Sequence, residues 1–325
     1  MKLATKVQAV AVGFLLTASA SSWSQADAPA YPSKPIKLVV GFSAGGPTDL
    51  PARKVAASLS TSLGQTVVVE NRTGAGGKIA ADYVASRPAD GYTLLLCTHI
   101  DAINTVLYKS GVVKLEDLTP VSTISKYYYL AAVANTLPVS TMEEFVAYAK
   151  ANRGTLNYGQ VGKGSSFELL TKRIEKDAGI QMTGISYRGS AEMIQDLLAG
   201  RIHFITAAPL SVLPLQSAGK VKLIGTTSPE RLESAPDVPT MKEEGFPITW
   251  FGWLGVCGPK DMPQPIVRKL SEALAQTVNA EDFQTLMAQS ASIPMASTPE
   301  ELSEIFRTTA RESQAMIEEH NLTLE

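Results

Sequence analysis

The stretch IKLVVGFSAGGPTDLPARKVAASLSTSLG, residues 36–64, decides the fold of this 325-residue chain. Residues 36–40 are mostly apolar and β-branched, which is typical of a buried strand. A glycine-rich loop follows, and residues 49–63 then predict a helix that Gly64 ends. A strand, a tight loop and a helix in this order form the first half of a βαβ unit.

The same alternation continues along most of the chain. We expect further strands at residues 66–69, 92–97, 129–134, 155–158, 181–185, 202–206 and 221–226. Further helices are expected at residues 78–86, 142–152, 166–178 and 191–198, and near the end around residues 266–278 and after Thr298. The spacing of these segments predicts an α/β fold with mostly parallel sheets.

Several of the predicted helices begin with Ser or Thr followed three residues later by Glu. The pairs are Thr141 with Glu144, Ser165 with Glu168, and Thr298 with Glu301. This spacing is that of a capping box, in which the two side chains satisfy backbone N–H groups reciprocally. We therefore expect a capping box at each of these helix starts.

The first 26 residues have the features of an export signal. Lys2 and Lys6 form a basic segment before a short apolar run at residues 7–16, and residues 24–26 offer a small-x-small cleavage site. A permanent membrane anchor is the less favoured alternative, because a spanning helix needs about 20 apolar residues. We expect cleavage near Ala26 and a soluble protein in the periplasm.

The charge of the chain limits the kinds of partner that it can bind. The formal net charge is −2 and no run of like charge occurs, so we expect no nucleic-acid partner.

Cys97 and Cys257 lie in apolar, strand-like stretches and could pair in an oxidising compartment. Two buried free thiols are the favoured interpretation, because isolated cysteines are among the most buried residues.

No repeat, low-complexity tract or linker divides the chain. Two lobes joined by strands that pass between them account for this, because such a connection needs no flexible linker. We predict one lobe made of residues 27–125 plus 226–325 and a second lobe made of residues 126–225.

Two glycine-rich loops stand between a predicted strand and a predicted helix. In the first, residues 41–49, glycines allow close backbone approach, and the following helix directs unpaired N–H groups toward the loop. Such a helix start can bind an anion, although an ordinary turn capped by Thr48 or Asp49 explains the segment equally well. Residues 158–166 repeat the pattern, so two facing helix starts could hold the two ends of a dianion.

The first loop also matches a hydrolase motif. Residues 41–45 have the G-x-S-x-G spacing that places a serine nucleophile, here Ser43, between strand and helix. No strand precedes this one to supply an oxyanion loop, and the candidate bases are only His99, His203 and His320. A serine esterase is therefore a weaker alternative, and we expect no enzyme activity.

The remaining motifs do not indicate a cofactor. Residues 74–77 lack the third glycine of a dinucleotide fingerprint, and residues 159–165 lack the Gly-Lys-Ser/Thr order of a phosphate loop. No metal-ligand spacing stands out, so we expect neither metal nor cofactor. Trp250, Phe251 and Trp253 are predicted to lie in the core or between lobes.

At the two glycine-rich loops the sequence resembles the Bug family, the extracytoplasmic receptors of tripartite tricarboxylate transporters. The resemblance extends over nearly the whole chain after the leader. It is carried by YPSKPI (31–36), GGPTD (45–49) with Arg53, VENRTGAGG (69–77), DGYTLL (90–95), LNYG (156–159), YRGS (187–190) and PDVPT (236–240).

The resemblance implies a two-lobed periplasmic binding protein (Venus-flytrap) fold, in which each lobe is a mostly parallel sheet flanked by helices. It implies a small carboxylic acid as ligand, including di-, tri- and aromatic carboxylates, and membrane transporter subunits as partners. A monomer is expected, and a receptor that signals to a membrane sensor kinase is the alternative within the same fold.

The predicted ligand-binding residues come from the loops that this resemblance places in the cleft. They are Phe42, Ser43, Ala44, Gly45, Gly46, Thr48, Asp49, Thr98, His99, Gln160, Gly162, Gly164, Ser165, Ser166, Tyr187 and Arg188. Phe42, Phe167 and Tyr187 could form an apolar wall. Arg188, where the family usually has lysine, could pair with a carboxylate.

Two other positions depart from the family pattern. Glu168 stands where a histidine is frequent, and His203 where an aspartate is common. The carboxylate of Glu168 adds negative charge near the proposed anion site.

Overall fold

The computed structural model describes residues 31–108, 111–162 and 165–319. The predicted export signal, Gly164 and His320 lie outside these ranges. Strand β1 (Ile36–Val40) and helix α1 (Asp49–Leu63) form as predicted, and Gly64 ends the helix in the left-handed conformation. Residues 36–64 therefore form the strand, loop and helix that their sequence predicts.

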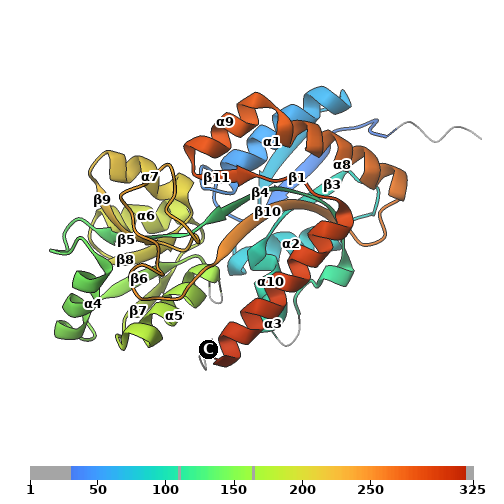
Figure 1. Cartoon of the computed structure of the whole chain (residues 1–325). Helices are drawn as coiled ribbons and strands as arrows, with labels where there is room; N and C mark the ends of the chain where they lie inside the picture. Colours follow the sequence, from blue (N-terminus) through green and yellow to red (C-terminus); the bar gives the residue numbers. More distant parts are fainter. Residues whose placement is uncertain (1–30, 109–110, 163–164, 320–325) are drawn as a thin grey trace, which may run out of the picture. The chain divides into compact units, whose positions relative to one another are not determined.

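The strands form two sheets (Figure 1). The first sheet has the order β11-β4-β10-β3-β1-β2 and the second the order β7-β6-β8-β5-β9. The bounds in the first sheet are β2 Val67–Asn71, β3 Thr93–Thr98, β4 Leu118–Tyr128, β10 Phe251–Pro259 and β11 Ser292–Pro294. Those in the second are β5 Leu130–Ala134, β6 Asn157–Gln160, β7 Thr183–Ser186, β8 Phe204–Ala207 and β9 Val221–Thr226.

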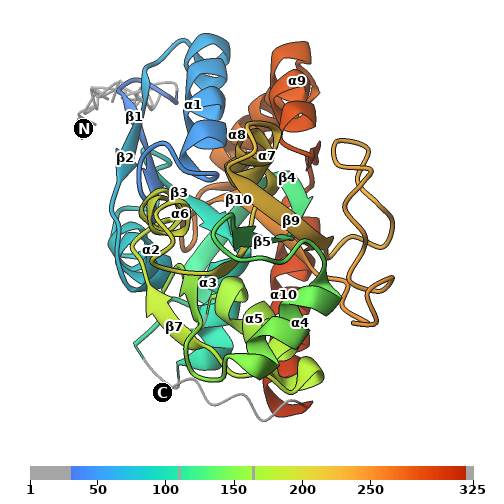
Figure 2. The ribbon, with the colours of Figure 1, turned by 90° about the vertical axis from the view of Figure 1, so that its left-hand side faces the viewer.

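Helices cover both sheets. Around the first lie α1, α2 (Lys78–Ala85), α3 (His99–Leu107), α8 (Gln264–Asn279), α9 (Glu281–Gln289) and α10 (Pro299–Glu319), with short 3₁₀ turns η1 (Ala75–Gly77) and η2 (Leu115–Asp117). Around the second lie α4 (Met142–Ala151), α5 (Ser166–Ala178), α6 (Ser190–Leu198) and α7 (Pro209–Ser217). The early helix α1 lies beside the late helices α8 and α9 (Figure 2), and Lys54 forms an ion pair with Asp282 there.

The sheets are mixed rather than mostly parallel. Strand β1 pairs in parallel with β2 and β3, and β6 pairs in parallel with β7 and β8. The pairings of β10 with β3 and β4, and of β5 with β8 and β9, are antiparallel. The βαβ pattern predicts the parallel pairs correctly, and the antiparallel ones arise where the chain leaves one sheet for the other.

The chain passes between the sheets at Tyr129 and again within residues 227–250. The single residue Tyr129 separates β4 from β5. Its backbone N–H donates to Thr227 Oγ1 at 2.8 Å, and Thr227 N–H donates to the Tyr129 carbonyl at 2.9 Å. Thr227 Oγ1 also donates to the carbonyl of Trp250 at 2.6 Å. Hydrogen bonds therefore connect the two passages in the buried interior.

The expectation of two free thiols is wrong. Cys97 of β3 and Cys257 of β10 form a disulfide, with Cα atoms 5.8 Å apart. The register pairs Gly255 with Cys97 and Cys257 with Leu95, so the two cysteines are diagonal neighbours on antiparallel strands. Sequence spacing could not reveal this, because 160 positions separate the two residues.

Two other predictions concern side chains around the sheets. Trp253 is fully buried and donates from Nε1 to Thr309 Oγ1 at 2.8 Å, which confirms its core position. Thr298 and Glu301 form the predicted reciprocal capping box. At α4, Thr141 accepts from Glu144 N–H, but the Glu144 carboxylate accepts from Ser140 N–H instead.

Candidate functional site

The first glycine-rich loop is organised by a buried carboxylate. Asp49, 1% exposed, accepts hydrogen bonds from Gly45 N–H at 2.8 Å, Arg53 Nε at 2.8 Å and Asn71 Nδ2 at 2.9 Å. Burial alone raises the pKa of Asp49, but the donors Arg53, Gly45 and Asn71 outweigh it and hold the pKa below 3.8. Asn71 Nδ2 also donates to the Phe42 carbonyl at 3.0 Å. Asp49 therefore stabilises the conformation of the loop, because its oxygens accept hydrogen bonds from protein donors.

The second glycine-rich loop joins β6 to α5. Ser165 is fully buried immediately before α5, and its side chain makes no capping bond, so the capping box predicted with Glu168 does not form. Gln160 Nε2 donates to Ser186 Oγ at 2.9 Å. Glu168 is buried one turn into the helix, 8% exposed.

Each glycine-rich loop closely approaches a segment beside the other sheet, and a glycine allows each contact. A Cβ atom on Gly162 of the second loop would lie 2.8 Å from the Cα of Gly76, which belongs to η1 beside the first sheet. A Cβ atom on Gly189 would lie 2.5 Å from Ser43 Oγ. Side chains at these two positions would hold the loops apart, so the absence of Cβ atoms permits the contact.

A small cavity lies where these segments meet. Its volume open to a water-sized molecule is about 20 Å³, room for about one water. It is lined by Phe42, Ser43, Gly46, Pro47, Thr48, Thr98, His99, Ile100, Tyr127, Val161, Phe167 and Ser190. Because sites for small molecules usually measure about 300–1,000 Å³, the loops have to separate further to admit a ligand.

Three buried polar atoms at the loops find no hydrogen-bond partner within the described part of the chain. They are Thr48 Oγ1, Gln160 Oε1 and Ser165 Oγ, on side chains at least nine-tenths buried. A buried polar atom without a partner costs about 1–3 kcal/mol. Such atoms beside two helix starts are groups that an anionic or polar ligand could satisfy.

His99 connects the two sides of this cavity. Its Nε2 lies 2.6 Å from Ser166 Oγ and 2.5 Å from the hydroxyl of Tyr129, and these two oxygens are 2.7 Å apart. Its Nδ1 lies 3.3 Å from both the N and the O of Trp253. Burial lowers the pKa of His99 to about 4, against a smaller opposite effect of the Trp253 backbone, so the ring is neutral at pH 7.

Several predicted site residues do not face the cavity. The Tyr187 hydroxyl donates to Asp196 Oδ2 at 2.6 Å. Arg188 is exposed, and its backbone N–H donates to Glu192 Oε2 at 3.1 Å. Ala44 is also exposed. These residues therefore contribute to the shape of their loops rather than to the lining.

Sequence reasoning missed other lining residues. Pro47 and Ser190 adjoin predicted site residues and could have been included from their position in the same motifs. Ile100 follows His99 directly at the start of α3. Val161 lies between the predicted site residues Gln160 and Gly162 and could have been included in the same way. Tyr127 gave no such signal, because only the course of β4 toward the second sheet brings it to the cavity.

The geometry does not favour the serine esterase alternative. Ser43 lies against Gly189, whereas His99 bonds to Ser166 and Tyr129. His203 Nδ1 accepts the backbone N–H of Asn157 at 3.0 Å. Neither described histidine is therefore placed to activate Ser43.

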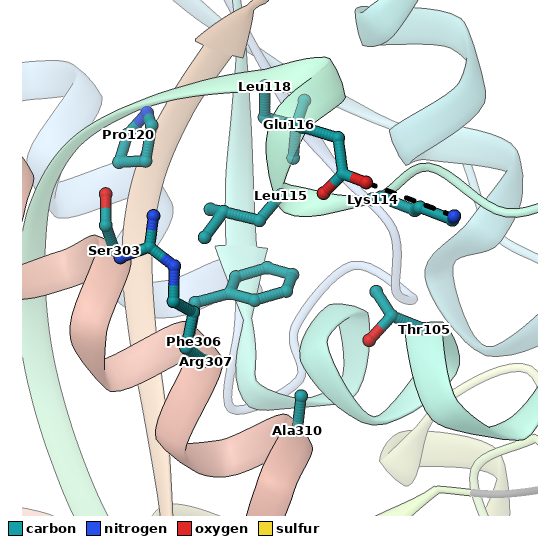
Figure 3. A pocket seen from close by; sticks show the side chains of 10 residues that line it. All are labelled: Thr105, Lys114, Leu115, Glu116, Leu118, Pro120, Ser303, Phe306, Arg307 and Ala310. Carbon is teal, nitrogen blue, oxygen red and sulfur yellow. Dashed lines mark ion pairs between the residues drawn. The ribbon is translucent and has the colours of Figure 1, made fainter.

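A larger hollow lies apart from the glycine-rich loops, between η2, β4, α3 and α10 (Figure 3). Its volume is about 530 Å³, and Phe306 and Leu115 lie toward its centre. Lys114 and Glu116 at its edge are 3.9 Å apart. No glycine-rich loop or unpartnered buried hydroxyl contributes to its described lining, so it lacks the convergent polar groups of the smaller cavity.

Two features are absent from the described residues. No cluster of three or more His, Cys, Asp or Glu side chains there is arranged to hold a metal ion. No helix in those ranges combines the length and the apolar character needed to cross a membrane.

Comparison with known proteins places these observations in a family. Residues 51–322 match the family described as "Tripartite tricarboxylate transporter family receptor". BugT of Bordetella pertussis is 33% identical over 305 residues, covering 91% of this chain and 92% of BugT. The structure of the periplasmic binding protein BugD aligns with a TM-score of 0.87 at 29% identity, covering 90% of this chain and 99% of BugD. An R. palustris protein solved with adipate aligns with a TM-score of 0.86 at 31% identity, covering 90% and 98% of the two chains.

Proposed function

Because the chain belongs to the tripartite tricarboxylate transporter family of receptors, we propose that it is a periplasmic receptor that captures a small carboxylate and delivers it to membrane transporter subunits. Members of this family include periplasmic binding proteins, and one of similar structure holds adipate. The cleavage near Ala26 and a monomeric state are parts of the same proposal.

The observation that carries the proposal is the meeting of two glycine-rich loops, each followed by a helix start, at one cavity. Thr48 precedes α1 and lines the cavity. Ser165 precedes α5 and does not line the cavity. The hydroxyl of each is buried without a partner in the described chain. Two helix N-termini favour negative charge, each by about 0.3–1 kcal/mol when exposed and more when buried. This pairing suits a ligand with two carboxylate groups.

The apolar lining supports a short hydrocarbon spacer between the charged ends. Phe42 lines the cavity from the first loop, Val161 from the second loop and Phe167 from the first turn of α5. Apolar walls with a few polar groups are typical of small-molecule sites. We infer that the ligand is a dicarboxylate with an aliphatic chain or ring between its carboxylates.

We propose two lobes that open and close around this ligand. The strand pairing supports a division at Tyr129 and within residues 227–250, close to the predicted limits of residues 126–225 for the second lobe. Strand β4 continues in the first sheet to Tyr128, and residues after β9 still bond to it, as Met241 N–H does to the Thr226 carbonyl at 2.7 Å.

A thermal-shift and calorimetry screen tests the proposal. The mature protein is mixed with adipate, malate, citrate or benzoate, and with adipamide as an uncharged control. A ligand at 100 times its Kd adds about 2.7 kcal/mol to the folded state, which raises the Tm by several degrees for a chain of this size. We expect a rise with at least one dicarboxylate and none with adipamide.

Two variants test whether the glycine-rich loops bind the acid that responds in the screen. Thr48→Val and Ser165→Ala each remove a hydroxyl that bonds to no described residue, so the Tm without ligand should stay within about 1–2 °C. The affinity for the responding acid should fall about tenfold, the value of one hydrogen bond to a charged group. A flat screen, an equal response to adipamide, or unchanged affinity in both variants contradicts the proposal.

A further inference from the structure

We propose that His99, Tyr129 and Ser166 form a latch between the two sheets, and that His99 is a positioning residue that holds the start of α5 at the ligand site. The latch rests on the proposed function for its role in binding. Its existence as a device that holds the two sheets together can be tested without any ligand.

The three residues come from three different parts of the fold. His99 is the first residue of α3, at the end of strand β3 in the first sheet. Ser166 is the first residue of α5, at the end of the Gly-rich loop of the second sheet. Tyr129 is the residue at which the chain passes from one sheet to the other. A hydrogen-bonded triangle among them therefore spans the site and includes one passage.

The triangle is tightly enclosed. Each of its three residues is at most 1% exposed. The mutual distances of 2.5–2.7 Å leave no room for an intervening water. The ring of Phe167 packs edge-on against Tyr129, with centroids 5.5 Å apart. Separating the sheets would break bonds at His99 and admit water to the ring.

Tyr127 and Tyr129, which face His99, carry no charge at neutral pH, whereas Asp101 is mostly ionised there. Tyr127 from β4 lies edge-on at 6.0 Å, and its pKa, like that of Tyr129, is raised by burial. Strand β10 presents only the backbone of Trp253. On α3, Asp101 directs its carboxylate to Thr98 N–H at 2.7 Å, and burial raises the pKa of Asp101 to about 6. On α5, Glu168 is buried one turn from Ser166.

Enclosure of a neutral imidazole makes the latch sensitive to pH. The closed arrangement holds the pKa of His99 near 4, whereas a ring exposed on opening titrates near 6.5. Protonation therefore favours the open arrangement: the latch is fully effective above pH 6.5 and weakens as the pH falls toward 4. By linkage these two values give about a tenfold shift toward the open form between pH 7.5 and 5.5.

The ligand-free test measures the distance between the sheets. Cysteines introduced at Glu143 of α4 and Glu272 of α8 can carry spin labels, because the two native cysteines are joined in a disulfide. Pulsed electron resonance on the full mature protein should show one short distance at pH 7.5 and a growing longer one at pH 5.5 and 4.5. In Ser166→Ala and Tyr129→Phe the longer distance should already be populated at pH 7.5.

The variant that isolates the titration is His99→Gln, whose amide can still hydrogen-bond but does not ionise. We expect it to remove the pH dependence of the distance, while the control His203→Gln retains it. With adipate, or another acid that responds in the screen, any difference in affinity between pH 7.5 and 5.5 that comes from the latch should likewise disappear in His99→Gln.

The outcomes separate the two proposals. A pH-dependent distance that disappears in His99→Gln supports the latch, even when no carboxylate binds and the proposed function fails. The latch is overturned if His99→Gln keeps the wild-type pH dependence, or if Ser166→Ala and Tyr129→Phe both keep the wild-type distance at pH 7.5. Circular dichroism of each variant verifies that it is folded.

Discussion

Asp49 illustrates how a single buried carboxylate can organise a glycine-rich loop. Its carboxylate lies against Gly45, Arg53 and Asn71, and it fixes the loop whose other side lines the cavity. The family resemblance placed Asp49 among the predicted ligand-binding residues. In the structure its oxygens already accept hydrogen bonds from three protein donors. Its negative charge would also repel the carboxylate of a ligand, so we assign it a structural role.

Asp49→Asn should therefore destabilise the protein. The amide cannot accept from all three donors or compensate the charge of Arg53, and loss of hydrogen bonds to a buried charged group costs about 2–3 kcal/mol. Urea unfolding at pH 7 measures the change. Asp82→Asn, at a half-exposed ion pair with Lys78, is the matched control and should cost under about 1 kcal/mol.

The same variant has a defined pH signature. The pKa of Asp49 is held below 3.8 in the folded protein, so its ionised form stabilises the fold above that pH and the contribution is lost as the pH falls through the lowered pKa. Asp49→Asn should flatten the acid limb of stability below about pH 4. An unchanged acid limb would contradict the proposed role.

At the level of secondary structure, two helix starts with the same sequence pattern behave differently. Thr298 and Glu301 form a reciprocal capping box at α10, whereas Ser165 makes no capping bond at α5. Thr298→Ala should lower the free energy of unfolding by about 1 kcal/mol. Ser165→Ala should leave it nearly unchanged. Equal losses in urea unfolding would show that the Ser165 hydroxyl caps the helix after all.

Elements with strong local signals were predictable from sequence. Helix α5 has the predicted bounds of residues 166–178, and α1 ends at Gly64 as expected. Strand β4 was missed because Pro120 and Lys126 interrupt its apolar pattern, which long-range pairing with β10 overrides. Helix α3 was missed because it begins directly after β3, with Asp101 in place of the usual Glu of a capping box.

The site was predictable only to the level of its loops. Both glycine-rich segments do meet at one cavity, since each follows a strand end and precedes a helix. The latch could not be inferred, because it depends on Tyr129 lying where the chain changes sheets. Side-chain direction was also hidden: nothing in the sequence shows that Tyr187 bonds to Asp196 instead of facing the cavity.

At the scale of the whole molecule, the disulfide between Cys97 and Cys257 joins distant parts of the chain within the first sheet. It closes a loop with a sequence separation of 160, which contains the entire second sheet. Restricting an unfolded loop of this length stabilises the folded state by up to about 5 kcal/mol in the chain-entropy model. We expect reductant to lower the urea midpoint markedly.

A Cys97→Ala/Cys257→Ala double variant is the control for that measurement. It should be as unstable as the reduced protein and indifferent to reductant. An untreated protein that titrates two free thiols after unfolding would contradict the disulfide.

The two passages between the sheets have a consequence for how such proteins diversify. Residues 130–226 contain every described strand of the second sheet, and the residues that flank them, Tyr129 and Thr227, bond directly to each other. A segment whose ends are adjacent can be exchanged as a cassette with only two junctions to match. Recombination between relatives could thus replace one side of the cavity, with Val161, Phe167 and Ser190, in one event, while the other side and the disulfide stay intact.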